Sequence, residues 1–310
     1  MRLIRNSLFV ILTYIVFNSS GYSQGCSDAG FCTIDLLKDH SMPGSEDNLK
    51  NTLKAGLTYG VGDFSINVIS PYLEYGNNIS ENLSLSAKVT FAATSGELNS
   101  NSNFSDIFLT SSYQLKKSST YNIALVSGVK IPLSTSNIKD GDQPLPMNYQ
   151  SSLGTFDFIL GLNLLYKDLG ISIAMQQPVV NINENTFFSS DGVNSPQAKY
   201  HSTNSFIRKG DILNRVSYNL TVLIDKFSIR PSILSIYHLA DDSFTDQNDI
   251  EQEIDGSAGL TLNGNIFLIY NISGTKSIEL VVGSPFITRE SRPDGLTREF
   301  VLGLEYKMLF

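Results

Sequence analysis

Tryptophan is absent from this chain of 310 residues, cysteine occurs twice and histidine only three times. Two cysteines are too few for the dense disulfide framework of small secreted proteins. Charged residues make up 17 % of the chain, below the usual share of about a quarter. Acidic residues outnumber basic ones by 30 to 22, which argues against a nucleic-acid partner.

Long apolar runs are also missing, apart from one near the start of the chain. Arg2 and Arg5 precede an apolar run at residues 8–17, and small or polar residues follow to position 25. This is the layout of a secretory signal peptide, and the run is too short to span a bilayer. We expect residues 1–25 to be a cleaved signal, with lipid modification of Cys26 as the alternative. The mature chain then has 20 basic and 30 acidic residues, a net charge of −10.

The last eleven residues alternate between two kinds of side chain and finish on Phe310. Leu302, Leu304, Tyr306 and Met308 share the face of Phe310, while the other face carries Glu305 and Lys307 among small residues. A period of two indicates a strand with two unlike faces. This end resembles the C-terminal strand of Gram-negative outer-membrane β-barrels, in which a terminal Phe serves as the signal for the barrel-assembly machinery. An edge strand of a soluble sandwich is the alternative.

Twelve segments after residue 50 read as strands, several of them with clean alternation. They lie near residues 51–61, 63–76, 80–94, 104–116, 119–132, 152–167, 170–182, 210–225, 226–240, 254–269, 275–287 and 297–310. Most exceed ten residues, which is long for a globular strand and suits a tilted membrane-spanning one. We therefore predict an all-β fold, a transmembrane antiparallel up-and-down β-barrel over residues 51–310. It has about twelve strands, and one miscounted hairpin would give ten or fourteen.

The connections between these strands alternate in length. Those after the second, fourth, sixth, eighth and tenth strands are short, and most of the others are long, up to residues 183–209. The tight turn at residues 60–62 is an exception. Short turns on one rim and long loops on the other are typical of outer-membrane barrels, whose long loops lie outside the cell. This pattern predicts a location in the Gram-negative outer membrane, in contact with lipid and lipopolysaccharide.

Alternation also predicts which charged side chains face the inside of the barrel. The predicted lumen residues are Lys88, Asp106, Lys130, Asp157, Arg215, Arg230, Asp255, Glu279 and Glu305. Both signs are present and neither dominates. They form either a structural network that seals a narrow barrel or a lining that selects which solutes pass.

Residues 26–50 form a candidate periplasmic or plug segment, and they hold both cysteines. Cys26 and Cys32 are expected to form a disulfide in an oxidising compartment. A copper or zinc site with His40 and Met42 is the sharper alternative, but the spacing fits no standard zinc pattern. Reduced, redox-active thiols are a further alternative. We predict no cofactor.

Catalytic signals are sparse. His238 lies at the end of a predicted strand, just before Asp241 and Asp242, and a general base beside a carboxylate would suit a hydrolase at the loop rim. The acidic residues between positions 241 and 253 are more simply a solvated loop. We therefore do not predict an enzyme.

A stretch in the middle of the chain supplies a second resemblance. Residues 150–161 read QSSLGTFDFILG, and the next strand ends Met175-Gln176-Gln177-Pro178. This stretch is similar to outer-membrane transporters of the meta-pathway phenol-degradation type and, more distantly, to FadL-like channels. FadL-like barrels have more strands and a larger N-terminal hatch than residues 26–50 provide. The resemblance implies diffusion of small molecules.

Three functions follow from the sequence. The first is an outer-membrane channel for passive diffusion of small-molecule solutes. The alternatives are a closed structural or partner-binding barrel with a redox- or metal-linked N-terminal segment, and a hydrolase at the rim.

Overall fold

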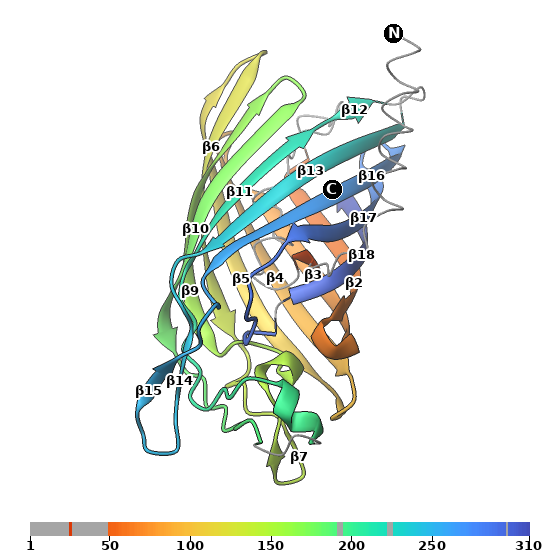
Figure 1. The fold of residues 1–310 in the computed structure, drawn as a ribbon. Helices are drawn as coiled ribbons and strands as arrows, with labels where there is room; N and C mark the ends of the chain where they lie inside the picture. Colours follow the sequence, from red (N-terminus) through yellow and green to blue (C-terminus); the bar gives the residue numbers. More distant parts are fainter. Residues whose placement is uncertain (1–24, 27–48, 191–194, 222–225, 296) are drawn as a thin grey trace, which may run out of the picture.

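Long antiparallel strands make up most of the described part of the chain and close into a barrel (Figure 1). The computed structural model describes residues 25–26, 49–190, 195–221, 226–295 and 297–310. Within these residues, twelve strands form the wall of the barrel, one of them made of two consecutive segments. They are β2 (Asn51–Gly62), β3 (Asn67–Asn78), β4 (Leu83–Ser95), β5 (Ser100–Lys117), β6 (Tyr121–Pro132), β9 (Thr155–Tyr166), β10 (Leu169–Asn181), β11 (Asp211–Tyr218) continued by β12 (Leu220–Thr221), β13 (Phe227–His238), β16 (Gly259–Ser273), β17 (Lys276–Ile287) and β18 (Thr297–Leu309).

The last strand closes the barrel onto the first long one. β18 pairs with β2 from Arg298 opposite Gly62 to Leu309 opposite Thr52. Every other neighbour in the barrel is also antiparallel and consecutive along the chain. The predicted up-and-down barrel of twelve strands is therefore confirmed.

Strand boundaries differ from the prediction where the alternation continues into polar sequence. β5 begins at Ser100 rather than near residue 104, because Asn101, Ser102 and Asn103 pair with β4 despite their low strand propensity. β16 begins at Gly259 rather than near residue 254. Asp255 therefore lies in an exposed turn before the strand, so the structure does not place it on the barrel wall.

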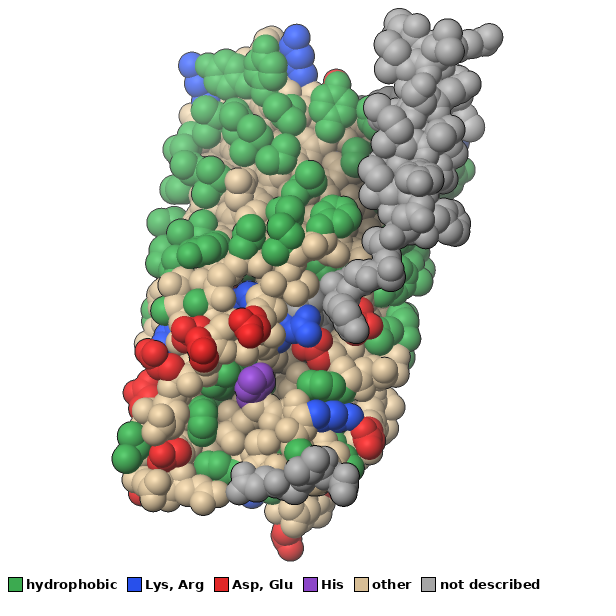
Figure 2. Space-filling model, viewed as in Figure 1, with side chains coloured by type: hydrophobic (Ala, Val, Ile, Leu, Met, Phe, Trp, Pro, Cys, Tyr) green, Lys and Arg blue, Asp and Glu red, His purple; other side chains and the backbone are tan. Residues whose placement is uncertain are grey.

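The two faces of the barrel differ as the alternation predicts. Large apolar side chains on the outer face are exposed, including Leu160, Leu162, Ile233 and Leu304. On the face that Figure 2 shows, hydrophobic side chains cover the outside of the barrel along much of its length. Charged side chains on the opposite face are buried inside. A closed sheet with an apolar exterior satisfies its backbone hydrogen bonds internally, as a hydrocarbon environment requires.

Tyrosines ring the outer face near the end of the barrel that carries the short turns, which we call the turn end. These are Tyr75, Tyr113, Tyr166, Tyr218, Tyr270 and Tyr306, all exposed. Tyrosine favours the boundary between hydrocarbon and water because its ring is apolar and its hydroxyl is polar. The ring therefore marks one boundary of a membrane belt.

The opposite end, which we call the loop end, carries the long connections (Figure 1). They are residues 133–154, 182–210, 239–258 and 288–296, with shorter ones at 63–66 and 96–99. Two small hairpins rise from them, β7 (Lys139–Asp140) with β8 (Gln143–Pro144), and β14 (Ser243–Thr245) with β15 (Glu251–Glu253). Three short 3-10 turns, η2 (Asp63–Ser65), η3 (Met147–Tyr149) and η4 (Pro196–Lys199), complete this end.

The loops pack against one another through two apolar clusters. One contains Ile66, Val68, Ala92, Leu145, Tyr149, Phe187 and Tyr200, and the other contains Met147, Leu153, Phe206 and Ile254. Asn185 links two loops, since its buried side-chain amide donates to the carbonyl oxygens of Ser136 and Leu145, each at 2.9 Å. The loop end is thus a packed cap rather than a set of independent loops.

The N-terminal predictions lie almost wholly outside the described residues. The signal at 1–25, the segment at 26–50, and a disulfide from Cys26 to Cys32 therefore stay predictions. Of that region, β1 (Gly25–Cys26) pairs with Thr297 and Arg298 of β18, at the loop end. In the described part of the chain, no helix is long and apolar enough to cross a membrane.

Candidate functional site

The barrel strands bring most of the predicted lumen residues to the inner face. Lys88, Asp106, Lys130, Asp157, Arg215 and Glu305 are buried, and Arg230 and Glu279 are half-buried on inward positions. Most of their neighbours along each strand are apolar and face outward; Ser105, which is buried, and Asn214 are polar exceptions.

Lys130 and Asp157 form the best-enclosed ion pair of the inner wall. Lys130 Nζ lies 2.8 Å from Asp157 Oδ2, and both side chains are at most 1 % exposed. The ammonium also donates to Thr155 Oγ1 at 2.9 Å, and the Gln176 amide donates to Asp157. β6, β9 and β10 are adjacent, so strand register alone brings these residues together.

A second charged group lies on β2, β3, β4 and β18. Lys54 Nζ donates to Glu74 Oε1 at 3.0 Å, and Lys88 Nζ lies 3.7 Å from the centre of the Tyr72 ring. The Tyr72 hydroxyl donates to Glu305. Gly56 makes this possible, because a Cβ there would lie 2.2 Å from the Tyr72 ring.

A third group lies across β11, β13 and β16. The guanidinium groups of Arg215 and Arg230 lie 5.7 and 5.9 Å from the centre of the Phe267 ring. Arg230 Nε donates to Asn219 Oδ1 at 2.7 Å. Glu279 of β17 stands opposite Glu305 of β18 in the register, and its charge also acts on Arg215, so it lies between this group and the second one.

The inner wall also has an apolar part. Phe108, Val126, Ile159, Ala174, Leu213 and Leu234 come from six successive strands and form one buried cluster. The inner face of this barrel is therefore part charged and part apolar, whereas the inner face of a typical outer-membrane barrel is polar throughout.

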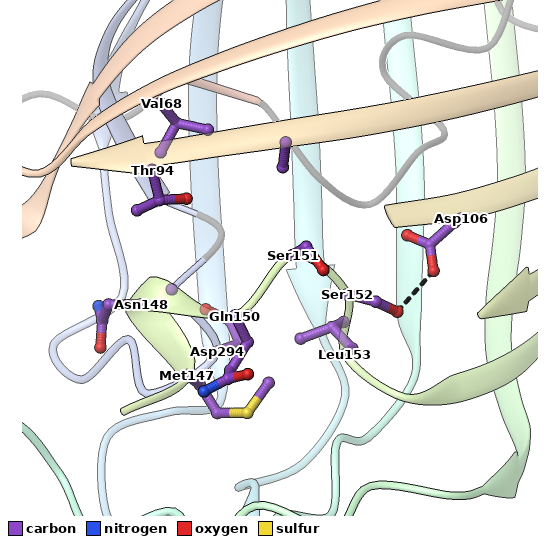
Figure 3. A pocket seen from close by; sticks show the side chains of 12 residues that line it. Val68, Thr94, Asp106, Met147, Asn148, Gln150, Ser151, Ser152, Leu153 and Asp294 are labelled. Atoms are coloured by element: carbon purple, nitrogen blue, oxygen red, sulfur yellow. Dashed lines mark hydrogen bonds between the residues drawn. The ribbon is translucent and has the colours of Figure 1, made fainter. Parts of the chain in front are cut away.

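The loop at 133–154 meets the barrel wall at a small pocket, whose lining residues Figure 3 shows. A cavity of about 10 Å³ remains there, room for about one water molecule. Asp106 of β5, Met147 and Leu153 of the loop, and Asp294 contribute to its lining. Ser152 Oγ donates to Asp106 Oδ1 at 2.6 Å and holds the loop against the wall. We call this point the constriction.

Beside the constriction lies a buried group of six ionisable side chains, which we call the rim cluster. It comprises Arg208, Asp211, His238, Asp242, Arg289 and Asp294, each with a side chain at most 8 % exposed. Asp211 and His238 stand opposite each other on β11 and β13. The other four come from three loops.

Two arginines hold the carboxylates of the rim cluster. Arg289 Nη2 donates to Asp294 Oδ2 at 2.7 Å, and Arg208 donates to Asp211 and lies 3.6 Å from Asp294. Burial disfavours the charged form of Asp294, but the nearby Arg289 and Arg208 outweigh it and hold its pKa below the ordinary value. Burial likewise opposes the charge on Arg289, yet Asp294 and Asp242 raise its pKa.

His238 lies between two carboxylates. Its Nδ1 is 2.7 Å from Asp211 Oδ1, and its Nε2 is 2.8 Å from Asp242 Oδ1. Asp242 also accepts from the backbone N–H of Lys209 at 2.9 Å. Because both ring nitrogens are engaged, neither faces a hydroxyl that it could activate as a general base. The rim-hydrolase hypothesis therefore gains nothing from this geometry.

Sequence reasoning missed much of this site. Lys54 and Glu74 follow the inward alternation of their strands and could have been found from it. Arg208, Arg289 and Asp294 lie in loops that have no periodicity, so nothing in the sequence marks them. Asp242 was expected in a solvated acidic loop but is buried, whereas Asp249, Glu251 and Glu253 are exposed.

Comparisons with known proteins support the fold. No protein-family model and no curated protein matches the sequence. The crystal structure of an outer-membrane channel from Pseudomonas putida F1 is similar with a TM-score of 0.59, at 13 % identity, over 88 % of this chain and 100 % of that one. At this identity the likeness concerns the fold alone.

More distant matches are also outer-membrane barrels. The KdgM porin has a TM-score of 0.45 at 11 % identity, over 84 % of this chain and 99 % of that one. Outer-membrane phospholipase A from Escherichia coli has a TM-score of 0.37 at 13 % identity, over 88 % and 95 %. Neither score is high enough to favour a function.

Proposed function

We propose that this protein is an outer-membrane channel through which small molecules diffuse passively, with a passage controlled at the loop end. One observation carries the proposal: charged side chains of both signs line the inside of a closed barrel whose outside is apolar. A barrel of about this size lies between small barrels filled by side chains and wide porins. Its inner charges then act on a solute at close range.

The solute class follows from the two kinds of inner surface. Phe108, Ile159 and Leu234 make one part of the inner wall apolar, and Lys130 with Asp157 makes the part beside it charged. All five are at most 2 % exposed, so in this proposal a solute meets them only when the passage opens. We propose small solutes with an apolar part and a polar group. The resemblance of residues 150–161 to meta-pathway phenol-degradation transporters and FadL-like channels implies diffusion of small molecules and does not specify their class.

The N-terminal segment is a second element of control in this proposal. Residues 26–50 would fill or border the lumen after a signal at 1–25 is cleaved, and a Cys26–Cys32 disulfide would close a small loop within it. Phe310 would direct assembly of the barrel in a membrane rich in lipopolysaccharide.

Liposome swelling tests the channel function. Vesicles that contain the refolded protein are placed in isotonic solutions of sugars of increasing size. We expect swelling with the smallest sugars and a sharp decline as size increases. Swelling no faster than that of protein-free vesicles, even for a variant that lacks residues 26–50, would contradict the proposal.

A closed structural or partner-binding barrel is the second candidate, favoured by the packed loop cap and the small cavity at the constriction. It predicts vesicles that stay impermeable when the loops are loosened by mutation. A channel predicts that the same mutations increase permeability.

A further inference from the structure

The rim cluster joins the fixed barrel wall to the loops that cover it. Asp211 and His238 belong to the wall strands β11 and β13. Arg208 belongs to the loop at 182–210, Asp242 to the loop at 239–258, and Arg289 and Asp294 to the loop at 288–296. Release of this one cluster would therefore loosen three loops at once.

The rim cluster is also in contact with the constriction, through the loop at 288–296. Asp294 lines the cavity there with Met147. Gly295 has a positive φ of 65° and packs so closely on the loop at 133–154 that a Cβ would lie 2.5 Å from the Asn148 Cα atom. Movement of the 288–296 loop would therefore move the wall of the constriction.

The geometry of the cluster requires a proton on His238. Carboxylates accept hydrogen bonds and do not donate them, so an imidazole between Asp211 and Asp242 needs an N–H on both nitrogens. A neutral ring would turn a lone pair toward one of the two carboxylates. Asp242 receives His238 on its Oδ1 atom, whereas its Oδ2 atom has no hydrogen-bond donor among the described residues and lies 3.9 Å from the Arg289 guanidinium.

The charge balance gives the same result. The cluster has three carboxylates and two guanidinium groups, so only a protonated His238 brings it to neutrality. With a neutral ring, one negative charge would remain buried without compensation, which is costly in a protein interior. Separation of the loops would admit water and relieve this cost.

We propose that the rim cluster is a proton-controlled latch: protonated His238 holds the three loops over the constriction, and loss of that proton releases them. The titrating ring faces Asp211 and Arg208 from one side and Asp242 from the other, with Arg289 and Asp294 behind. The consequence for permeation rests on the proposed channel function, whereas the loop movement does not.

Thiol accessibility tests the loop movement directly. A Met147→Cys substitution, combined with Cys26→Ser and Cys32→Ser, places a single thiol at the buried constriction. Its rate of labelling by a maleimide is compared with that of a free thiol at each pH, from about pH 6 to about pH 9, on both sides of an unperturbed histidine. We expect the relative labelling rate to rise about tenfold or more between the low and the high pH. A change of this size follows if the closed state binds the proton about tenfold more tightly than the released state does.

Matched variants assign the effect. His238→Gln should label rapidly at both ends of the range, and Asp242→Asn, which leaves two carboxylates against two guanidinium groups, should stay protected at both. His201→Gln, outside the cluster, should respond as the parent does. A pH response that is unchanged in His238→Gln, or absent from the parent, would overturn the latch. If His238→Gln does not fold, Asp242→Asn with an unchanged response would overturn it too.

Channel conductance separates the latch from the proposed function. Conductance that rises with pH in parallel with labelling supports both. A pH-dependent thiol with no conductance at any pH supports the latch and contradicts the channel. Conductance without pH-dependent labelling contradicts the latch alone.

Discussion

The contribution of a charged residue to the stability of this barrel depends on how completely the residue and its partner are buried. Lys130 and Asp157 are almost fully enclosed, whereas Lys199 and Glu97 form an ion pair in which both side chains are exposed. Removal of one member of a buried pair leaves an uncompensated charge. An exposed pair of the same chemistry contributes little, because water and salt screen it.

A Lys130→Met substitution measures this difference. It should lower the free energy of unfolding by about 3 kcal/mol or more, since the Asp157 carboxylate would stay buried and lose its ion-pair partner while keeping the hydrogen bond from the Gln176 amide. Denaturant unfolding in detergent gives the value. Circular dichroism reports the transition, because the chain has no tryptophan whose fluorescence could be followed. Lys199→Ala is the control and should cost at most about 1 kcal/mol. Equal losses in the two variants would show that burial does not govern the strength of these pairs.

Asp294 gives a second residue-scale prediction, which concerns pH. Its pKa is lower in the folded protein than in the unfolded chain, so its stabilising effect is complete above the unfolded pKa and is lost only as pH falls through the folded one. At neutral pH, Asp294→Asn should accelerate amide hydrogen exchange at residues 288–295 about tenfold, for a loss of roughly 1.4 kcal/mol. The difference from wild type should persist at about pH 5 and vanish only in stronger acid. A difference already lost at about pH 5 would contradict the sign of this shift.

At the scale of elements, the sequence predicted the strands of the barrel but not the contacts of its loops. The alternation in residues 155–166 fixes both the strand and its faces, because each side chain must face either lipid or the interior. All twelve barrel strands could be found in this way. Asp255 was misplaced because its strand starts at Gly259, about five residues later than the pattern indicates.

The loops could not be predicted because their contacts join distant parts of the chain without a period. Arg208 and Asp294 lie 86 positions apart, and only the closed barrel brings them together. Tyr149 packs against Tyr200 with ring centres 6.0 Å apart, which no local pattern indicates. Propensity and alternation describe neighbours along a strand, whereas a loop cap depends on the whole fold.

Tyr149 tests whether the cap is an independently packed unit. Its ring is fully buried, and its hydroxyl accepts from the backbone N–H of Leu98 at 3.1 Å. Tyr149→Ala should cost about 3–5 kcal/mol within the cap and leave the strands intact. Limited proteolysis should then cut the loops at 133–154 and 182–210 faster, with unchanged strand content. Asp142→Ala, at an exposed position of the same loop, should change neither. Loops as resistant as those of the wild type would contradict the packed cap.

At the scale of the whole molecule, the loop end should face the outside of the cell. A single cysteine at Asp142 in the loops, or at Ser118 in a short turn, can be compared in cells with both native cysteines replaced by serine. A membrane-impermeant maleimide should label the first in intact cells and the second only after the outer membrane is opened. The reverse pattern would invert the orientation of the barrel.

The central claim is that this barrel conducts small solutes through an inner wall of charged and apolar side chains. Single-channel recording in a planar bilayer tests it most directly. The account predicts discrete conductance steps from the refolded wild-type protein, longer open times in Tyr149→Ala, and altered ion selectivity in Lys130→Met. A bilayer that stays silent with all three folded proteins, and with a variant that lacks residues 26–50, would contradict it.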